Sequence, residues 1–417
     1  MRPGQTHSLQ SIDWASLIRP GDLVVWSQGS AEPVTLTTEL MNDRQKIGPI
    51  RAFIGFSFGQ SVHPDHTDQV SFTSYCGTAN NSKLGNVLNI LPVHYSELPA
   101  ILGDQRPVLL LSLSESDDPD HFGYGAGADF PADLLDSARL VIAEVNARAP
   151  GTGTGKEIRR DQIDILVHTD APLPAPKAVP PNETEQKIAA LISGLIEDGS
   201  TLQIGLGALP VAILRALHDH QHLGFHSGVF VQEVANLIDA GVITNEQKTI
   251  DRGISVAGIL SGDEALMDWA NGRENLQLKP VSYTHNLEVL SGIDRFVALN
   301  SAIEVDLTGQ VNAEVAAGRY LGAVGGAPAF MRGAAASKGG LGIIALPSTA
   351  KGKSRIVRNL SGPVSTARSD VGLVVTEHGI ADLRGASLSE RRERLLAIAH
   401  PDVVSELAAS PDKAGQN

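Results

Sequence analysis

Several short, uninterrupted apolar runs constrain the fold of this 417-residue chain more than any other feature. They lie at residues 22–26, 108–113, 139–145, 201–204, 295–299, 342–346 and 371–376. Runs of this kind, bounded by polar turns, are typical of strands in a parallel sheet that is buried on both faces. Because patterns typical of helices separate them, the sequence predicts an α/β fold with mostly parallel sheets.

A proline-rich segment, DAPLPAPKAVPPNE at residues 170–183, interrupts this pattern. Its five prolines disfavour both helix and sheet, so we expect an extended connector. A helix signal follows at once, because Asn182 can cap a helix and Glu185 stands three positions later, as in a capping box. Apolar residues then recur at helical spacing, at Ile188, Leu191, Ile192, Leu195 and Ile196. We expect this helix to end at Gly199.

The two sides of the connector also resemble each other. The segment GDLVVWSQGSAEPVTL at residues 21–36 parallels GSTLQIGLGALPVAIL at residues 199–214, with one insertion before the proline. Each contains an apolar strand, a glycine turn and a proline that opens a helix. The sequence therefore predicts two similar α/β domains in tandem, at residues 1–180 and 181–417.

Composition excludes several classes of function. The 33 Lys and Arg against 47 Asp and Glu give a net charge of −14, and no basic run is present, so we expect no nucleic-acid partner. The single cysteine, Cys76, excludes an internal disulfide, and no histidine spacing predicts a metal site. No apolar run approaches the ~20 residues of a membrane span, and the N-terminus has no apolar core of signal-peptide length. We expect a cytoplasmic protein without a membrane partner.

Two glycine loops are candidate ligand sites. In LQIGLGALPVAIL, Gly205 and Gly207 permit close backbone approach, and the start of a helix at Pro210 would attract an anion. In GAVGGAPAF, the adjacent Gly325 and Gly326 could offer backbone N–H groups to an oxyanion or a thioester. The first loop has neither a Rossmann nor a P-loop pattern, and ordinary turn chemistry is the alternative explanation of both loops.

A third segment, ALPSTAKGKSRIVRN, follows an apolar run and gathers four cations, Lys351, Lys353, Arg355 and Arg358. Such a cluster suits phosphate groups, although a solvated charged loop is the alternative. His226 in FHSGVF and His378 in TEHGIADLRG each end an apolar run, where a structural hydrogen bond and a catalytic base are both open.

Taken in order, these loops resemble the acetyl-CoA hydrolase/CoA-transferase family that includes 4-hydroxybutyrate CoA-transferase. In the first half the similar segments are GSAEP, VHYSELP, HFGYGAG and VIAEVN. In the second half they are IGLGALP, AGVITN, DLTGQVNAE, RGAAASKGG, IIALPSTAKGK and VVTEHGIADLRG. The resemblance implies a class I CoA-transferase fold with two tandem α/β domains, an active site in the cleft between them, and a homo-oligomer.

The resemblance also implies an acyl-CoA site, with coenzyme A as part of the substrate and no permanently bound cofactor. Its CoA-binding residues would be Gly205, Leu206, Gly207, Ala208, Leu209, Ile303, Gly325 and Lys351, the last beside the CoA phosphates. Asn286, in THNLEVL, aligns with the asparagine that polarises the thioester carbonyl. Gly326 aligns with the backbone donor of the same oxyanion hole.

The resemblance fails at the nucleophile. Family transferases have a glutamate two positions after a histidine, and its carboxylate attacks the thioester; here the segment reads His226-Ser227-Gly228. Ala327 and Ala329 also replace a glutamine and an aspartate of the family's GGQxDF loop. His378 stands where the family usually has tyrosine or glutamine. Changes concentrated at one site, beside an intact CoA cradle, indicate altered chemistry.

The interpretation is therefore an enzyme that hydrolyses an acyl-CoA by direct attack of water. Asn286 and the Gly326 N–H would stabilise the oxyanion, and His226 or His378 would act as general base. Three alternatives stay open: a CoA-transferase with an unrecognised nucleophile such as Glu233, hydrolytic C–C cleavage of a β-keto, including cyclic, acyl-CoA, and a non-catalytic acyl-CoA-binding protein.

Overall fold

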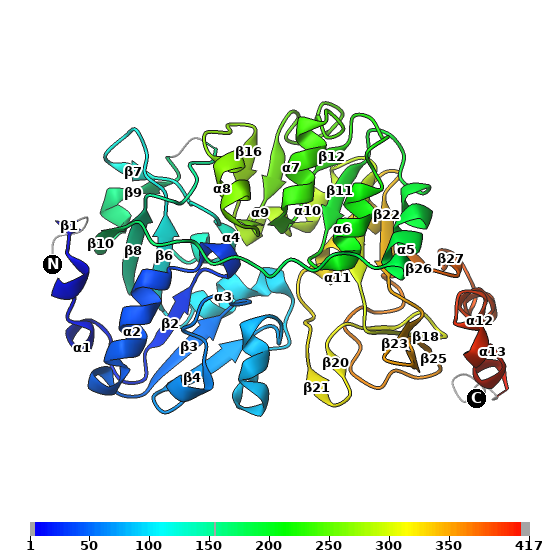
Figure 1. Ribbon diagram of the computed structural model, residues 1–417, viewed down its shortest axis with the longest axis horizontal. Coiled ribbons are helices and arrows are strands. Elements are labelled where there is room, and N and C mark those ends of the chain that lie inside the picture. Colours follow the sequence, from blue (N-terminus) through cyan, green and yellow to red (C-terminus); the bar gives the residue numbers. More distant parts are fainter. Residues whose placement is uncertain (1–4, 154–155, 410–417) are drawn as a thin grey trace.

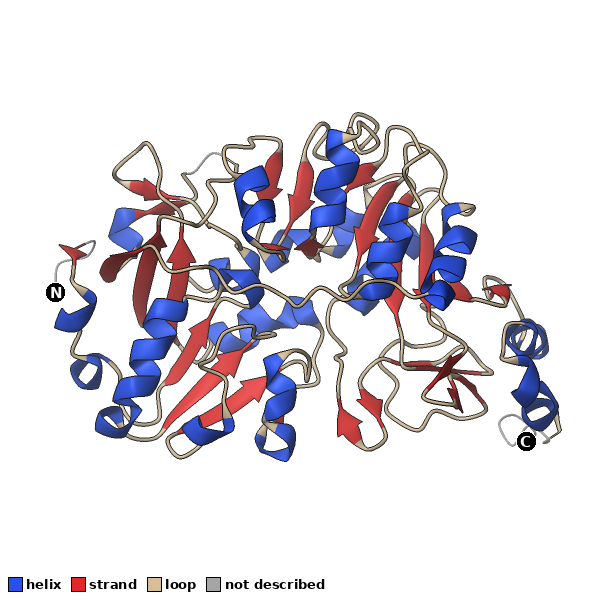
Figure 2. Ribbon diagram, viewed as in Figure 1, coloured by secondary structure: helices blue, strands red, loops and turns tan. Residues whose placement is uncertain are grey.

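The chain forms two α/β halves that lie side by side. The structure, a computed structural model, describes residues 5–153 and 156–409. Figure 1 shows the N-terminal half in blue and cyan, and the C-terminal half in green to red beside it. Each half is built on one large sheet, and helices lie on either side of the strands (Figure 2).

The N-terminal sheet has eight strands in the order β1-β10-β8-β6-β2-β3-β4-β5, and all of its neighbouring strands are parallel. The strands are β1 (Gln5–Thr6), β2 (Leu23–Trp26), β3 (Ile50–Ile54), β4 (Val70–Ser74), β5 (Asn89–Ile90), β6 (Val108–Leu113), β8 (Leu140–Asn146) and β10 (Ile165–Thr169). In the register, Leu109 of β6 pairs with Val25 of β2 on one side and Val141 of β8 on the other. Every residue of β6 is buried, which explains its continuous apolar run.

The C-terminal sheet has six strands in the order β12-β11-β17-β22-β26-β27, parallel except for the last. They are β11 (Thr201–Ile204), β12 (Gly224–Phe225), β17 (Phe296–Ser301), β22 (Leu341–Ala345), β26 (Leu373–Thr376) and β27 (Gly379–Asp382). Each apolar run of the sequence forms a strand of one of the two sheets. The predicted α/β class with mostly parallel sheets is confirmed.

Thirteen α-helices connect and cover these strands within the described chain. They are α1 (Trp14–Leu17), α2 (Val34–Ile47), α3 (Leu98–Gly103), α4 (Asp129–Ala132), α5 (Glu183–Ser193), α6 (Ala208–Arg215), α7 (Gln232–Asp239), α8 (Glu264–Ala270), α9 (Val281–Thr284), α10 (Leu287–Ser291), α11 (Ala327–Ala336), α12 (Leu388–Ala397) and α13 (Pro401–Ala408). No helix in residues 5–153 and 156–409 combines the length and the apolar composition needed for a membrane span.

Smaller pairs of strands complete the fold. They are β7 (His121–Phe122) with β9 (Ile158–Arg159), β13 (Val229–Phe230) with β15 (Ile259–Leu260), β14 (Ser255–Ala257) with β16 (Leu276–Leu278), β18 (Glu304–Asp306) with β19 (Val311–Asn312) and β25 (Ile356–Val357), β20 (Val315–Ala316) with β21 (Arg319–Tyr320), and β23 (Thr349–Ala350) with β24 (Lys353–Ser354).

Helix α5 begins where the sequence predicts but ends earlier. Asn182 accepts a hydrogen bond from the Glu185 N–H at 3.0 Å, and the Glu185 carboxylate accepts one from the Asn182 N–H, which confirms the capping box. The last helical residue is Ser193, with Gly194 as C-cap. The predicted end at Gly199 was wrong, because Gly194 already weakens the helix and Gly199, at φ 74°, lies at the turn into β11.

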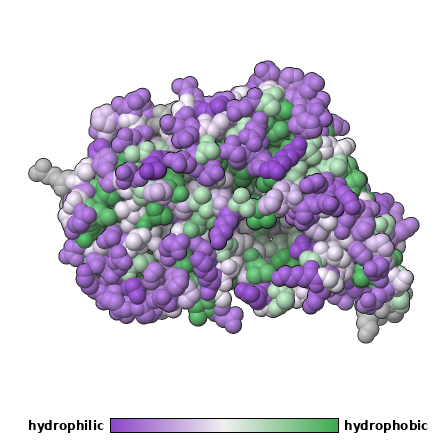
Figure 3. Space-filling model, in the orientation of Figure 1, coloured by the Kyte–Doolittle hydropathy of each residue, from purple (hydrophilic) through white to green (hydrophobic). Residues whose placement is uncertain are grey.

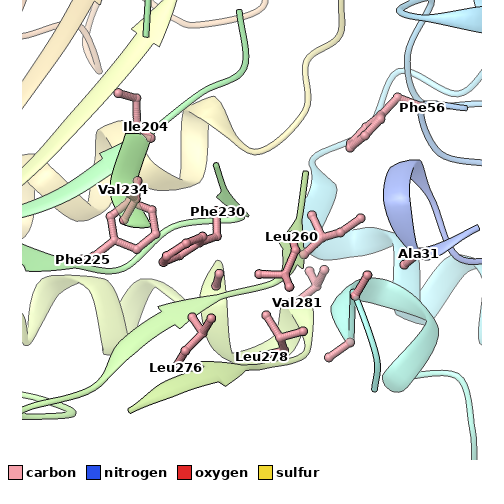
Figure 4. Close-up of a cluster of buried hydrophobic side chains, with 14 of the residues drawn as sticks. Ala31, Phe56, Ile204, Phe225, Phe230, Val234, Leu260, Leu276, Leu278 and Val281 are labelled. Atoms are coloured by element: carbon pink, nitrogen blue, oxygen red, sulfur yellow. The ribbon is translucent and has the colours of Figure 1, made fainter. Parts of the chain in front are cut away.

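The predicted connector is extended, and the core continues past it. Residues 170–182 contain neither helix nor strand and cross the face shown in Figure 1 from one half to the other. One hydrophobic cluster nevertheless joins both sides: Ala31 and Phe56 of the N-terminal half lie in the same buried cluster as Leu260 and Val281 of the C-terminal half (Figure 4). The boundary near residue 180 therefore stays a prediction about the chain's domains.

Candidate active site

A cavity of about 220 Å³ lies between the two halves, where strands of both sheets end. Gln28 follows β2 and Tyr75 follows β4, whereas Ile204 ends β11 and Asn300 lies near the end of β17. The carboxyl ends of parallel strands are the usual place for ligand sites in such sheets. The face seen in Figure 3 is hollowed near its centre.

Aromatic rings, amides and glycine backbone make up most of the cavity wall. The lining residues are Gln28, Phe56, Tyr75, Cys76, Thr78, Tyr95, Gln203, Ile204, Gly205, Leu206, Gly228, Val229, His285, Asn300, Ala323, Gly326, Ala327 and Phe330. None of these residues is an aspartate, a glutamate, a lysine or an arginine. The wall therefore offers no carboxylate nucleophile of the kind that family transferases use.

The N-terminal wall is a closed network of hydrogen bonds around Gln28. Its side-chain oxygen accepts from the Tyr75 hydroxyl at 3.0 Å and from the Phe56 N–H at 3.1 Å. Its amide nitrogen donates to Asp129 and to the Tyr95 hydroxyl, which in turn donates to Asp129 at 2.6 Å. Because these groups satisfy one another, Tyr75 and Tyr95 are held in fixed positions against the cavity.

Asp129 anchors that network from behind. It is buried, and its backbone adopts a φ of 49°, a conformation that asparagine and aspartate tolerate better than most residues. Burial raises the pKa of its carboxyl group from 3.8 to about 6, while the hydrogen bonds from Tyr95 and Gln28 act in the opposite direction. Asp129 does not line the cavity, so it supports the wall without reaching a ligand.

The C-terminal wall is organised around His285, which is only 5% exposed. Its ring centroid lies 4.9 Å from that of Tyr95 and 4.4 Å from that of Phe330. A Cβ atom placed on Gly326 would lie 2.4 Å from His285 Nε2, and one on Gly228 would lie 3.1 Å from Cε1. A side chain at position 326 would therefore force the imidazole to move, and one at position 228 would crowd it.

Two features of its surroundings determine the hydrogen bonding and the protonation of the His285 ring. Its Nδ1 lies 2.9 Å from the hydroxyl oxygen of Thr284, the last residue of α9. Desolvation lowers the pKa of the imidazole from 6.5 to about 3, so the ring is neutral at physiological pH. The sequence analysis missed His285, and the available signal was its place directly before Asn286 in THNLEVL.

The structure corrects the expectation for Asn286. This residue is exposed and forms the N-cap of α10, where its side-chain oxygen accepts from the N–H groups of Glu288 at 2.8 Å and Val289 at 3.2 Å. Asparagine is a favoured N-cap residue, and this role turns the side chain over the start of the helix. Asn286 does not line the cavity, whereas His285 does.

Neither histidine named as a candidate base reaches the cavity. His226 is fully buried; its Nε2 donates to the Thr284 carbonyl oxygen at 3.2 Å, and burial lowers its pKa to about 3. His378 is exposed in the turn between β26 and β27, with its Nε2 3.7 Å from the Glu377 carboxylate. Neither His226 nor His378 is part of the cavity wall, so the geometry of this cavity gives no support to their role as general base.

The position of the missing nucleophile opens directly into the cavity. Gly228 lines it, and a Cβ at that position would lie 3.8 Å from the Phe330 ring. Glu233, the possible substitute, lies on α7 with its carboxylate 2.9 Å from Arg215. Glu233 is not part of the wall, so it does not replace the glutamate in this arrangement.

The expected CoA-binding loop lies at the cavity mouth. Gly205 and Leu206 line the cavity, and the Leu206 side chain is 43% exposed. Gly207, at φ 122°, is the N-cap of α6, which begins at Ala208. The predicted helix start at Pro210 is thus two residues too late. Leu209, the second residue of α6, has a buried side chain.

The remaining candidate residues lie further from the cavity. Ile303 donates its N–H to Asn312 at 2.8 Å and is not part of the cavity wall. Gly325 precedes Gly326 at φ 59°, and its carbonyl oxygen accepts from the Tyr95 N–H at 3.1 Å. Lys351, at φ 49°, is exposed in the turn between β23 and β24.

The four cations around Lys351 divide into two kinds. Lys351 and Lys353 are exposed on the hairpin. Arg355 instead lies 3.4 Å from the Ala302 carbonyl, and Arg358 donates to the Glu406 carbonyl in α13 at 2.8 Å. The two lysines are thus exposed, whereas the two arginines are half-buried and directed at least in part to backbone carbonyls.

Helix α11 directs its N-terminus at the cavity. Gly326 is its N-cap and Ala327 its first residue, and both line the wall. Within the described chain, no acceptor is found for the N–H groups of these two residues. Free N–H groups at the start of a ten-residue helix favour negative charge, so this end of the cavity suits an oxyanion.

Comparison with known proteins agrees with the fold. Residues 262–410 match the acetyl-CoA hydrolase/transferase C-terminal domain. The chain is 35% identical over 389 residues to 4-hydroxybutyrate coenzyme A transferase of Clostridium kluyveri, covering 91% of each protein.

Two solved structures extend the similarity over almost the whole chain. RipA of Yersinia pestis is 30% identical with a TM-score of 0.91, covering 97% of this chain and 96% of that one. A 4-hydroxybutyrate CoA-transferase of Porphyromonas gingivalis is 31% identical with a TM-score of 0.83 and the same coverage. The resemblance seen in the sequence is thus confirmed, and the chain belongs to the acetyl-CoA hydrolase/CoA-transferase family of enzymes.

Proposed function

We propose that this enzyme hydrolyses the thioester of an acyl-CoA by direct attack of water, without a covalent glutamyl-CoA intermediate. The observation that supports this most is the cavity wall, which has glycine at position 228 and no carboxylate on any lining residue. A transferase needs a group that holds the acyl or CoA moiety while the acceptor is exchanged. Hydrolysis needs only an oriented water molecule and a stabilised oxyanion.

Oxyanion stabilisation would come from α11. The N–H groups of Gly326 and Ala327 would donate to the carbonyl oxygen of the thioester as negative charge develops there. Gly326 is required for a second reason, because any side chain there would collide with His285 Nε2. This assignment retains Gly326 in the expected role and removes Asn286 from it.

The CoA moiety would extend from this cavity over the loop at residues 205–209, with Gly205 and Leu206 at the mouth. Gly325 and Ile303 are proposed as further contacts, and Lys351 as the partner of the CoA phosphates. In a chain with a net charge of −14, an anionic cofactor tail depends on such a local cation. Coenzyme A thus belongs to the substrate in this proposal.

The acyl group is proposed to be uncharged. The described wall contains no lysine or arginine, and its histidine is neutral, so a carboxylate on the acyl chain would lose hydration without gaining a partner. The rings of Phe56, Tyr75, Tyr95 and Phe330 offer apolar surface instead. We further propose a cytoplasmic enzyme that assembles as a homo-oligomer.

CoA transfer to a carboxylate is the second candidate, favoured by the names of the similar proteins. It requires a nucleophile other than the carboxylate expected at position 228. Hydrolytic C–C cleavage and simple acyl-CoA binding are the remaining alternatives. C–C cleavage would leave the thioester intact, and simple binding would give no product.

The decisive experiment incubates the protein with a panel of acyl-CoAs, with and without acetate. Each reaction is followed for free thiol and, by mass spectrometry, for new CoA esters. Free thiol without acceptor supports hydrolysis. Acetyl-CoA formed only with acetate overturns it in favour of transfer, consumption of the acyl group with the thioester intact overturns it in favour of C–C cleavage, and binding without turnover overturns every enzymatic reading.

A further inference from the structure

The imidazole of His285 lies at the place where the hydrolysis proposed above needs a proton acceptor. Its Nε2 lies beside both Gly228, the position of the missing carboxylate, and Gly326, the proposed oxyanion donor. A base between these two positions is adjacent to a water molecule that approaches a thioester carbonyl held by α11. This inference rests on the proposed hydrolysis and names the residue that activates the water.

The hydrogen bonds around Thr284 determine which ring nitrogen has the proton. Thr284 Oγ1 lies 2.9 Å from His285 Nδ1 and donates to the Pro280 carbonyl at 3.3 Å. Since the hydroxyl has one hydrogen, which is directed to Pro280, it accepts from Nδ1–H. This is the arrangement that uses both contacts, and it leaves Nε2 with a free lone pair toward the cavity.

The surroundings of His285 keep that lone pair available. Within the described chain no protein group forms a hydrogen bond with Nε2. Burial keeps the pKa of the ring far below 7, so the base is unprotonated at neutral pH. The titratable groups on the elements around it are Tyr95, Tyr75 and Cys76 across the cavity, Asp129 behind Tyr95, Tyr283 on α9, and His226 with Lys248 behind α9.

We propose that His285 is the general base of the hydrolysis and that Thr284 is the residue that positions it. The ring is held between Tyr95 and Phe330, which fixes its plane, and the hydroxyl of Thr284 fixes its tautomer. A base oriented by a third group is the arrangement that makes water a competent nucleophile.

The reaction then balances without a cofactor. As the water oxygen forms a bond to the thioester carbonyl carbon, one water proton moves to His285 Nε2 and the carbonyl π electrons move to oxygen, facing the Gly326 N–H. The carbonyl bond re-forms as the C–S bond breaks, and the proton on Nε2 passes to the departing sulfur. The products are a carboxylic acid and the thiol of coenzyme A, and the imidazole is neutral again.

Asparagine and alanine at position 285 test the base itself. His285→Asn is expected to lower kcat of thiol release by at least about tenfold, with KM changed less than about threefold. Binding of a non-hydrolysable thioether analogue, measured by calorimetry, should persist. In His285→Ala, free imidazole in the buffer should restore part of the rate, which a purely structural role would not allow.

His218→Asn is the matched control, because it makes the same substitution at an exposed histidine that is not part of the cavity wall. Its kcat should stay within about twofold of the wild type. Circular dichroism and thermal unfolding of each variant establish that it is folded.

The positioning role has its own pair of variants. Thr284→Val removes the hydroxyl that accepts from Nδ1–H, so kcat should fall by about tenfold or more, whereas Thr284→Ser retains the hydroxyl and should restore most of the rate. A pH profile adds a further readout: in an Asp129→Asn background, which removes the nearby carboxyl group with a pKa of about 6, kcat/KM should be flat from pH 8 to pH 5, because the pKa of His285 is lowered to about 3.

The outcomes separate this inference from the proposed function. If the wild type releases thiol and His285→Asn does so at a similar rate, the inference is overturned while hydrolysis stands. Failure of imidazole rescue together with equal rates for Thr284→Val and Thr284→Ser would also overturn it. If the wild type forms CoA esters only with acetate, the proposed hydrolysis itself fails.

Discussion

The rings of Tyr95 and His285 are in contact across the boundary between the two halves, with centroids 4.9 Å apart and planes inclined by 48°. One belongs to the N-terminal hydrogen-bond network and the other to the C-terminal glycine pocket. The acyl end of the cavity is therefore completed only when both halves are in place. A substitution in the wall of one half should therefore change the position of the ring contributed by the other half.

Removing the Tyr95 hydroxyl tests the N-terminal network. Tyr95→Phe deletes the hydrogen bond to the Asp129 carboxylate and one acceptor of the Gln28 amide. We expect the free energy of unfolding to fall by about 1–3 kcal/mol at pH 7.5, the cost of unsatisfied buried polar groups. Urea denaturation measures it. Tyr283→Phe, at a less buried hydroxyl that donates to Asp251, should cost less, and equal losses would contradict the prediction.

Asp129→Asn removes one titrating group while retaining a residue that tolerates its backbone conformation. In the wild type the folded state holds the proton up to a pKa of about 6, against 3.8 for the unfolded chain, so stability falls as pH rises through that window. Relative to the variant, the wild type should lose about 3 kcal/mol of unfolding free energy between pH 3.5 and pH 7.

Denaturant titrations at several pH values measure this difference. Asp104→Asn makes the same substitution at an exposed carboxyl group and provides the comparison. A constant difference between wild type and Asp129→Asn across the range would show that Asp129 does not titrate as described.

Gly326→Ala tests the fit between α11 and His285. The new Cβ would lie 2.4 Å from Nε2, so the ring must move and the proposed base and oxyanion donor are both displaced. We expect kcat of thiol release to fall at least 100-fold. Gly194→Ala, at an exposed helix end with its nearest contact at 3.6 Å, should leave kcat unchanged. An active Gly326→Ala enzyme would remove this glycine from the site.

Restoring the family's carboxylate requires two changes. A Cβ at Gly228 would lie 3.1 Å from His285 Cε1, so Gly228→Glu alone should displace the ring and stop hydrolysis. Combined with His285→Asn, the glutamate has room, and we expect a covalent enzyme–CoA adduct in intact-protein mass spectra after incubation with acyl-CoA. Gly194→Glu is the control. No adduct with any acyl-CoA would count against position 228 as the nucleophile site.

Lys351→Gln tests the phosphate contact. Removing this exposed cation should raise KM for an acyl-CoA by about three- to tenfold with little change in kcat, and the effect should shrink at high salt. The same acyl group on pantetheine, which lacks the nucleotide phosphates, should not distinguish variant from wild type. If Lys353→Gln has the same effect as Lys351→Gln, the contact is a diffuse one shared by the hairpin.

The sheets could be predicted from sequence because their strands are buried on both faces and therefore read as apolar runs, as Val108–Leu113 does throughout. The capping box at Asn182 could be predicted because it depends only on residues three positions apart. The roles of His285 and Asn286 could not be predicted in this way. Both are polar neighbours, and only the packing of α9 and α10 decides that one caps a helix while the other faces the cavity.

The same limit applies to His226, which ends an apolar run as a catalytic residue might. Its ring nitrogen is instead bonded to the Thr284 carbonyl inside the core, a partner 58 residues away in the chain. Long-range partners of this kind are not encoded in local spacing. Gly228 and Gly326 could be singled out from the sequence, but the His285 ring that lies against both positions could not.

The continuous core beneath the connector restricts the motion of the two halves relative to each other. Side chains from both halves, such as Phe56 and Leu260, belong to one buried cluster, so swinging the halves apart as rigid bodies would expose that cluster to water. We therefore expect access to the cavity at its mouth, where Leu206 is partly exposed. We expect the substrate to enter through the mouth of the cavity while the two halves stay together.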